Sequence, residues 1–372
     1  MKDFSIPITS CNEFGNRIYN KTVKERIPID GTIELTRRCN LKCPYCYAVS
    51  DSSKKELTYK QICHILDEIA KAGCFWLTIT GGEPLLRQDF LSIYTYARKK
   101  GLIIVILTNG TLITPRIADY FVKYPPYLVE ITLNGITQKT YETISGVPGS
   151  FQRCLQGIHL LIKRNIQLKL KTTVTTLNVN QLWEIKKYVE GLGIDFRFDA
   201  ILHPAVNGSR KPCNFRISPE EVLKLDLADK KRSEEWKKRC QKLAGSPEAD
   251  ELYNCGAGIN SFQINPYGEL SICMLSQDSY DLCRGSFTDG WYDSIFKIRK
   301  QKRKREYRCT KCNLFSLCGP CPDWAQLETG EKEKHVDYLC QVAILRQEAF
   351  AKEVRRKWAT ESGRKDLIES PR

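Results

Sequence analysis

Cysteine is the residue type of this chain that points most clearly to chemistry, because 17 of its 372 residues are cysteines. Three of them, Cys39, Cys43 and Cys46, form a CxxxCxxC triplet in a segment without another good metal ligand. Three thiolates suit a 4Fe-4S cluster with one iron left open, whereas a closed structural site needs a fourth ligand. The triplet therefore predicts an iron-sulfur cluster whose open iron can bind a substrate. A zinc site that borrows a distant fourth residue is the alternative interpretation.

A second motif, Gly81-Gly82-Glu83-Pro84, follows the triplet by one predicted helix and strand. Glycine lets the backbone come close to a ligand, and the Glu83 carboxylate can accept hydrogen bonds from an ammonium group. Together with segment 39–46, CNLKCPYC, this motif resembles the signatures of the radical S-adenosylmethionine (SAM) superfamily. The resemblance implies that the open iron binds SAM, that Tyr45 lies against its adenine, and that segment 81–84 binds its methionine amino group.

Polar residues at two further strand ends extend the expected cofactor site. Segment 132–135, Thr-Leu-Asn-Gly, resembles a Ser-Leu-Asp-Gly-like segment with which the family holds the ribose or carboxylate end of SAM, although Asn134 lacks the carboxylate. An ordinary strand end with an Asn-Gly turn is the alternative. The residues expected to bind SAM are Tyr45, Gly81, Gly82, Glu83, Pro84, Asn109, Thr132 and Asn134.

The C-terminal third holds a second group of cysteines with a recognisable order. This order resembles the SPASM domain, an extension that carries auxiliary iron-sulfur clusters, except that two residues instead of the usual three separate Cys318 from Cys321. The fourth ligand of the nearer cluster is either Cys283 or absent, which would leave an open iron, and a zinc ribbon is the alternative for the whole module. The resemblance implies that Cys309, Cys312, Cys318 and Cys340 bind the distal cluster and that Cys255, Cys273 and Cys321 bind the nearer one.

The elements that must position these motifs alternate between strand-like and helix-like patterns. Helical spacing of apolar residues is clearest in 58–71 and 180–190. Six βα units form either a partial barrel or an open doubly wound sheet, and the resemblance implies an α/β fold with a partial (β/α)6, TIM-like barrel. Either fold places chemistry at the carboxyl ends of the strands, where the motifs fall. The predicted strands are 32–36, 75–80, 102–108, 128–133, 167–173 and 195–200.

Three further residues are candidates for catalysis because they follow the last predicted strand. Asp199 and His203 are expected to face the active site, and Cys213 could donate a hydrogen atom to a substrate radical, although a structural role is the simpler interpretation of each. The predicted organisation is an N-terminal extension (1–30), the radical SAM barrel (31–203), a connector (204–250), the SPASM iron-sulfur domain (251–345) and a basic C-terminal tail (346–372).

The sequence argues against an exported, a membrane-spanning or a nucleic-acid-binding protein. The N-terminus lacks the pattern of a signal peptide, and the longest apolar run, 102–107, is too short to span a bilayer. A cytoplasmic, reducing location is therefore expected, where cysteines serve as metal ligands rather than disulfides. The net charge of +15 comes without a nucleic-acid motif, so neither nucleic acid nor a membrane is expected as a partner. The basic run 297–308 is either a solvated face or a surface for an acidic electron donor such as flavodoxin or ferredoxin.

The resemblance implies reductive cleavage of SAM to a 5'-deoxyadenosyl radical that abstracts hydrogen from a peptide or protein, with crosslinking, epimerisation or oxidation as the outcome. Sulfatase maturation is less favoured, because Met274 stands where those relatives carry aspartate. Only about 30 residues precede the first strand, so a separate leader-recognition protein, or none, is expected. The alternatives are maturation of a tetrapyrrole or small cofactor, and a non-catalytic iron-sulfur protein for electron transfer or binding.

Overall fold

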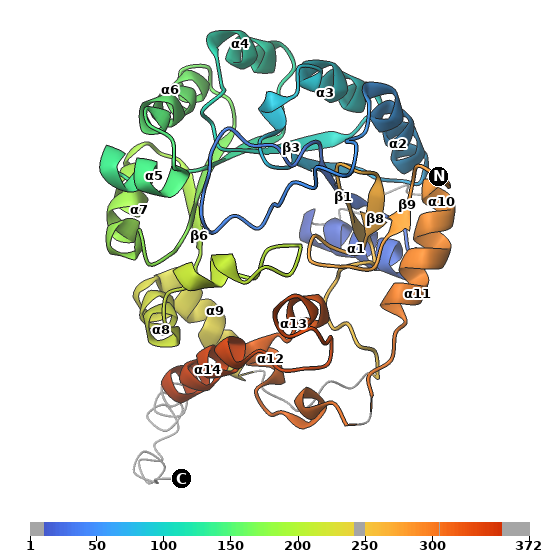
Figure 1. Ribbon diagram of the computed structural model, residues 1–372, viewed down its shortest axis with the longest axis vertical. Coiled ribbons are helices and arrows are strands. Elements are labelled where there is room, and N and C mark those ends of the chain that lie inside the picture. The colour runs from blue at the N-terminus through green and yellow to red at the C-terminus, as the bar shows by residue number, and fades with distance from the viewer. Residues whose placement is uncertain (1–10, 242–249, 305, 352–372) are drawn as a thin grey trace, which may run out of the picture.

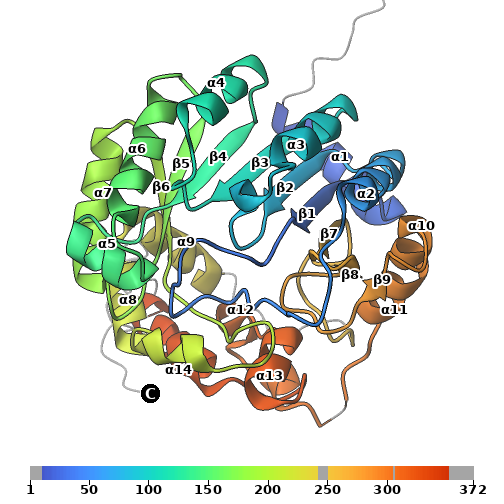
Figure 2. The same ribbon diagram turned by 45° about the horizontal axis from the view of Figure 1, so that its top comes forward.

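Six consecutive parallel strands form the main sheet of the computed structural model, which describes residues 11–241, 250–304 and 306–351. The strand order β6-β5-β4-β3-β2-β1 follows the chain without a reversal, whereas a doubly wound sheet would change direction at a switch point. The strands curve into an arc with its helices outside (Figure 2), so the predicted α/β fold with a partial barrel is confirmed. These strands are β1 (Asp30–Glu34), β2 (Trp76–Thr80), β3 (Ile103–Thr108), β4 (Leu128–Thr132), β5 (Leu168–Thr173) and β6 (Asp195–Asp199).

The helices that connect these strands cover the outer face of the arc (Figure 2). The first of them starts with a capping box between Thr58 and Gln61, and it buries Ile62, Leu66 and Ile69 against the sheet. This agrees with the helix expected from the apolar spacing in 58–71. The helices are α2 (Tyr59–Lys71), α3 (Phe90–Lys99), α4 (Pro115–Lys123), α5 (Gln138–Ser145), α6 (Ser150–Ile162) and α7 (Leu182–Gly191).

Three short strands from the cysteine-rich region extend the same sheet beyond β1. The strand β7 (Ser261–Ile264) pairs in parallel with β1, and β8 (Glu269–Ser271) and β9 (Tyr280–Asp281) follow in antiparallel order. Gly31 makes this pairing possible, because a Cβ atom there would lie 2.4 Å from the Phe262 ring. The C-terminal module is therefore joined to the barrel through its first strand, which sequence patterns did not predict.

Helices from two distant parts of the chain close the open side of the arc (Figure 1). The segment expected as a connector folds mainly into α8 (Pro219–Ala228) and α9 (Lys230–Gln241). The helix α14 (Asp337–Arg346) packs on α8, where Arg346 Nε donates to Asp226 Oδ2 at 2.8 Å. From residue 352 on, the predicted basic tail lies outside the described residues. The other helices are α1 (Cys11–Glu25), α10 (Phe287–Asp289), α11 (Phe296–Arg299), α12 (Phe315–Cys318) and α13 (Pro322–Thr329).

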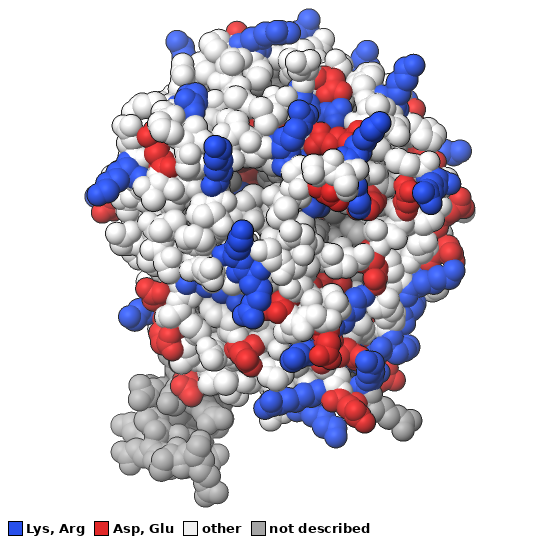
Figure 3. All heavy atoms as spheres, in the orientation of Figure 1, with Lys and Arg blue, Asp and Glu red and all other residues white. Residues whose placement is uncertain are grey.

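Single turns of 3-10 and π-helix complete the described secondary structure. The 3-10 turns are η1 (Pro84–Leu86), η2 (Val179–Gln181), η3 (Lys211–Phe215) and η5 (Arg308–Lys311), and the π turns are η4 (Gly290–Ile295) and η6 (Gln347–Ala351). On the face drawn in Figure 3, basic and acidic side chains are interspersed. Within the described ranges, none of the helices has the length and apolar character needed to cross a bilayer.

Candidate active site

A cavity of about 710 Å³ lies at the carboxyl ends of the barrel strands. The ends of β2 to β6 form one side of it, and the loop between β1 and α2, which crosses the open side of the arc in Figures 1 and 2, forms another. A volume of this size is typical of small-molecule sites. The residues predicted from sequence that line the cavity are Cys39, Cys43, Cys46, Tyr45, Gly81, Gly82, Asn109, Thr132, Asn134, Asp199 and His203.

The three cysteines of the triplet lie together at the cavity wall. Burial, followed by the neighbouring Cys46 and Cys39, raises the pKa of the Cys43 thiol to about 12. The Cys39 sulfur accepts hydrogen bonds from Leu41 N at 3.4 Å and Asn109 Nδ2 at 3.7 Å. Three grouped thiols with nearby donors fit a cluster that takes three protein ligands. In the part of the chain that the structure describes, no three Cys, His, Asp or Glu side chains could hold a single metal ion directly.

Gly81 and Gly82 allow the loop after β2 to pack closely against the loop after β1, in addition to any contact with a ligand. A Cβ atom on Gly81 would lie 2.3 Å from the Thr36 carbonyl oxygen, and one on Gly82 would lie 2.3 Å from that of Arg38. Gly81 also has φ of 142°, which disfavours other residues. Because Gly82 N donates to Thr36 O at 2.7 Å, the loop that starts the cysteine triplet is fixed against the loop after β2.

Glu83 is fully buried and does not belong to the residues that line the cavity. Its Oε1 accepts from Thr108 Oγ1 at 2.7 Å and from Leu85 N at 3.1 Å, and its Oε2 accepts from Asn109 N at 2.7 Å. Burial raises the pKa of the carboxyl to about 7, although these hydrogen bonds lower it. The carboxylate therefore positions Thr108 and Asn109, which do line the cavity. The resemblance implied that segment 81–84 contacts the SAM ammonium group directly. Pro84, which belongs to this segment, is also buried and does not line the cavity.

Replacing Glu83 by glutamine tests this positioning role. The amide has one acceptor oxygen, so its NH2 group must face at least one backbone N–H of Leu85 or Asn109. An unsatisfied buried donor costs about 1–3 kcal/mol, so we expect the free energy of unfolding to fall by that amount without SAM, and the Kd for SAM to rise about tenfold. Denaturant titration and anaerobic calorimetry measure the two effects. The exposed Glu190 on α7, changed to glutamine, is the control, and parental stability of Glu83→Gln would contradict the assignment.

The amide of Asn134 explains why a carboxylate is not needed at this position. Its Nδ2 donates to the Tyr45 hydroxyl, and its Oδ1 accepts from Thr173 N at 3.0 Å. The amide thus makes both contacts without a negative charge, whereas a carboxylate could do so only if the Tyr45 hydroxyl donated. Asn134 thus fixes the ring of Tyr45 at the cavity wall and links the cysteine loop to the end of β5.

Charged residues that sequence reasoning missed form the far wall of the cavity. Arg197 from β6 forms two hydrogen bonds with the buried Glu130, at 2.8 and 2.9 Å, and Lys171 from β5 lies 3.2 Å from the same carboxylate. The sequence could have indicated Lys171 and Arg197, because both lie near the carboxyl ends of predicted strands. Asp199 forms an ion pair with Arg197 at 2.9 Å. The missed lining residues of this wall are Lys171, Arg197, Arg232, Trp236, Met274 and Arg346.

Two guanidinium groups of that wall share one buried carboxylate. Arg232 Nη2 lies 2.6 Å from Asp226 Oδ1, and Arg346 Nη2 lies 2.8 Å from Asp226 Oδ2. Arg346 also stacks 3.7 Å from the centre of the Trp236 ring. Two positive charges with one negative partner leave this part of the wall cationic, which favours an anionic ligand group. Because these residues come from α8, α9 and α14, no sequence pattern indicated them.

The three catalytic candidates differ in their surroundings. His203 lies between the rings of Tyr47 and Trp324, at 5.6 and 5.7 Å between centroids, and its Nδ1 contacts Pro204 O at 2.7 Å. Burial lowers the pKa of His203, which favours a neutral ring. Cys213 lies in η3 and does not line the cavity. The structure therefore gives no support to transfer of a hydrogen atom from Cys213 to a substrate in the cavity. Cys213 follows the last barrel strand in sequence, but its side chain is not part of the cavity lining.

The C-terminal cysteines separate into the two groups that the SPASM resemblance implied. Burial raises the pKa of Cys318 to about 12, and its neighbours Cys340, Cys309 and Cys312 raise it as well. Burial likewise raises the pKa of Cys321 to about 11, with further contributions from Asp323 and Cys255, and that of Cys273 to about 12, with contributions from Asp323 and Cys321. The seven thiols thus lie in one group of four and one group of three.

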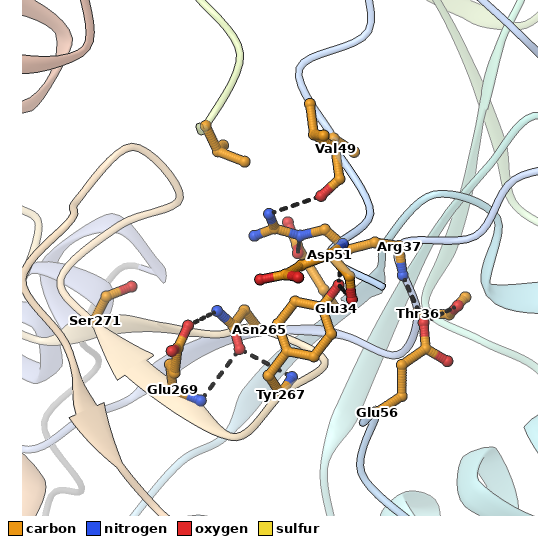
Figure 4. Close-up of polar contacts among 12 residues, drawn as sticks. Glu34, Thr36, Arg37, Val49, Asp51, Glu56, Asn265, Tyr267, Glu269 and Ser271 are labelled. Atoms are coloured by element: carbon orange, nitrogen blue, oxygen red, sulfur yellow. Dashed lines mark hydrogen bonds and ion pairs between the residues drawn. The ribbon is translucent and has the colours of Figure 1, made fainter. Parts of the chain in front are cut away.

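Polar contacts hold the cysteine loop against the C-terminal module. Figure 4 shows Arg37 between Glu34 and Val49, with Tyr267 of the β7–β8 turn beside it. Arg37 Nε donates to the buried Glu34 at 3.0 Å, and its guanidinium lies 5.9 Å from the centre of the Tyr267 ring. Asp51 N donates to the Tyr267 hydroxyl at 2.8 Å. The loop that carries the triplet is therefore positioned from both the barrel and the second module.

Known proteins resemble this chain in sequence and in fold. The family model described as Radical SAM superfamily matches residues 33–190. The AdoMet-dependent heme synthase of Methanosarcina barkeri is 33% identical over 324 residues, which cover 80% of this chain and 92% of that protein. The chain belongs to the radical SAM superfamily. The superfamily binds SAM and a 4Fe-4S cluster, and this radical SAM protein is accordingly an enzyme.

Two further likenesses extend over the C-terminal module of this radical SAM protein. The subtilosin biosynthesis protein AlbA of Bacillus subtilis is 26% identical over 336 residues, covering 83% of this chain and 72% of that protein. The structure of Streptococcus suis SuiB bound to precursor peptide SuiA has a TM-score of 0.69 and 19% identity, covering 92% and 84% of the two chains. The second likeness shows the fold alone. The predicted radical SAM enzyme with a C-terminal SPASM module is confirmed.

Proposed function

We propose that this radical SAM protein abstracts hydrogen from a peptide or protein substrate and so modifies it by crosslinking, epimerisation or oxidation. When bound, SAM and its cluster supply a 5'-deoxyadenosyl radical for this step. The observation that carries the proposal is the cavity of about 710 Å³, which has three grouped thiols on one wall and Met274 of the SPASM module on another. A site with walls from both modules suits a substrate larger than SAM. The relatives AlbA and SuiB, whose names concern a bacteriocin and a precursor peptide, favour a peptide.

The chain's own residues would act by holding and orienting. Cys39, Cys43 and Cys46 would hold the SAM-binding cluster, and Tyr45, kept in place by Asn134, would lie against the adenine. Enclosure of the cavity between barrel and SPASM module would exclude water and small reductants from the reactive carbon. The SPASM cysteines would hold two auxiliary 4Fe-4S clusters, of which the nearer adjoins the cavity because Met274 follows Cys273 directly.

The partners proposed beyond the substrate follow from the same chemistry. Reductive cleavage needs one electron at a time, which an acidic flavodoxin or ferredoxin would supply to a protein of net charge +15. A separate leader-recognition protein would present a peptide substrate. The reducing cytoplasm is the compartment that suits both the thiols and these donors.

A tetrapyrrole is the second candidate substrate. The cationic part of the wall at Arg232 and Arg346, which share only Asp226, suits a carboxylate of such a molecule, and the heme synthase of M. barkeri is 33% identical to this chain. This candidate requires the same radical step on a different carbon skeleton.

One experiment separates the two candidates. The anaerobically reconstituted enzyme is given SAM and dithionite with synthetic peptides encoded beside its gene or with an iron tetrapyrrole that carries propionate groups. We expect peptide mass spectra to show loss of two hydrogens, or uptake of deuterium in D2O, together with faster release of 5'-deoxyadenosine. Conversion of the tetrapyrrole while all peptides remain unchanged would contradict the peptide proposal and establish the second.

A further inference from the structure

We propose that the carboxylate of Asp323 is the fourth protein ligand of the auxiliary cluster that Cys255, Cys273 and Cys321 would hold. The inference rests on the proposed function, because it assumes that these three cysteines bind a cluster. It assigns the missing ligand to a residue that no cysteine pattern includes.

Asp323 lies beside the cysteines of the nearer group. It follows Cys321 by two residues, in the first turn of α13, and its side chain is fully buried. Its Oδ2 lies 3.9 Å from Cys273 Sγ, and its Oδ1 accepts from the Tyr253 hydroxyl at 3.0 Å. Tyr253 precedes Cys255 by two residues. The carboxylate is therefore adjacent to all three segments that carry the cysteines.

Cluster binding would remove the hydrogen-bond donor that faces Oδ2. In the structure the Cys273 thiol is that donor. A cysteine that binds iron is a thiolate, which has no proton to donate. A buried, ionised carboxylate beside a thiolate is strongly unfavourable unless a cation or a metal ion compensates for its charge. An iron of the cluster would supply that compensation.

The nearby cations already have other partners. Lys332 Nζ donates to Asp278 Oδ2, to the Tyr253 hydroxyl at 3.1 Å and to Gln301 Oε1 at 3.3 Å. Among the described residues, none forms an ion pair with Asp323 at 4.0 Å or less. Lys332 therefore acts on Asp323 only at longer range and through the Tyr253 hydroxyl, whereas it pairs with Asp278 directly.

The cysteine suggested by sequence proximity lies elsewhere. Cys283 Sγ is 3.8 Å from Gln61 Nε2 and 3.9 Å from Tyr267 O, on the side of the module that faces α2. Gly268 approaches the same sulfur, since a Cβ there would lie 3.0 Å from it. Among the described residues, neither Cys273 nor Cys321 is one of the groups that act on the Cys283 thiol. Cys283 would have to move with its whole turn to reach the group of three cysteines.

Binding of an external ligand tests the proposal without measuring turnover. The full chain carries Cys39→Ala, Cys43→Ala and Cys46→Ala, so that the open iron of the SAM-binding cluster is removed. Isotopically labelled cyanide is then added to the reduced protein, and its coupling to the cluster is measured by electron-nuclear double resonance. We expect no cyanide on this parent, whose nearer cluster would have four protein ligands. Asp323→Ala and Asp323→Asn should each bind one cyanide, because an iron becomes open.

Two further variants keep the result interpretable. Asp323→Cys should again exclude cyanide while it changes the g values of the reduced cluster, because a thiolate replaces an oxygen ligand. Asp278→Ala, which removes a carboxylate of the same module that is paired with Lys332, should behave as the parent. If Asp323→Ala loses about four irons instead of binding cyanide, restoration of that iron by Asp323→Cys alone supports the same ligand role.

Three outcomes would overturn the inference. Cyanide binding to the parent would show that the iron is open and that Asp323, in its protonated form, only donates a hydrogen bond to Cys273. Exclusion of cyanide by every variant, with iron content unchanged, would show that another residue is the ligand. A parent that holds no auxiliary cluster would remove the proposed cluster assignment itself, and with it this ligand.

Discussion

Replacing Cys39, Cys43 and Cys46 together by alanine is expected to remove about four irons per chain and to abolish release of 5'-deoxyadenosine from SAM. The three thiols are grouped at the cavity wall, and the loops after β2 and β3 face them. Without these ligands the chain offers no iron that SAM can bind inside the cavity. The rate should therefore fall to that of a mixture without protein, which is the largest effect expected of any change.

Iron analysis, the absorption of the reconstituted protein and chromatography of 5'-deoxyadenosine measure this result. Cys63→Ala is the control, because Cys63 is buried in α2 on the outer face of the barrel and should leave iron content and cleavage unchanged. Full iron content or continued cleavage in the triple variant would contradict the assignment of the triplet. Stoichiometric zinc in anaerobically prepared parent protein would contradict the iron-sulfur interpretation as a whole.

Replacing Cys309 and Cys312 by alanine is expected to separate cleavage of SAM from conversion of substrate. Both belong to the group of four that includes Cys318 and Cys340. The double variant should lose about four of about twelve irons and keep the parental rate of 5'-deoxyadenosine release without substrate, because the triplet and the Gly81–Glu83 loop are untouched. Product formation should be lost, since the auxiliary clusters are proposed to carry an electron away from the substrate radical.

The comparison requires a folded variant. A metal site often contributes to the folding free energy of its module, so circular dichroism and monodispersity must match those of the parent. Cys283→Ala is the matched control, because it removes an exposed thiol of the same module that lies beside Gln61 rather than in either group of cysteines. A folded double variant that converts substrate at the parental rate would show that the distal cluster is structural, and the electron-transfer role would then be dropped.

Much of the barrel was predictable because each of its elements has a local pattern. The six predicted strands contain the six observed ones to within a few residues, since buried parallel strands form short apolar runs between amphipathic helices. The strands β7, β8 and β9 were not predictable, because they have only four, three and two residues. Only β7 pairs with the barrel, at β1, which lies more than two hundred positions away, and β8 and β9 are added to β7 in turn. Such short strands form only when another part of the chain provides the edge.

The same distinction applies to the site. Residues with a required chemical type at a fixed spacing, such as the thiols of the triplet, could be identified because a loop of a few residues must bring them to one cluster. Glu83 was predicted to accept hydrogen bonds from the SAM ammonium group, and the structure adds three protein donors to its carboxylate. Sequence cannot distinguish these roles, because both require a buried acceptor at the same position.

The sequence by itself determined the superfamily, the barrel and the thiols that group together, because each depends on residue types at short, regular separations. Only the tertiary structure decided which charges face the cavity and which carboxylate adjoins the nearer auxiliary cysteines. Arg232 and Arg346 meet at Asp226 although more than one hundred residues separate the two arginines, and Asp323 meets Cys273 across 50 positions. Contacts at such separations depend on how whole helices pack, and helix packing is determined by the complete core rather than by any local pattern.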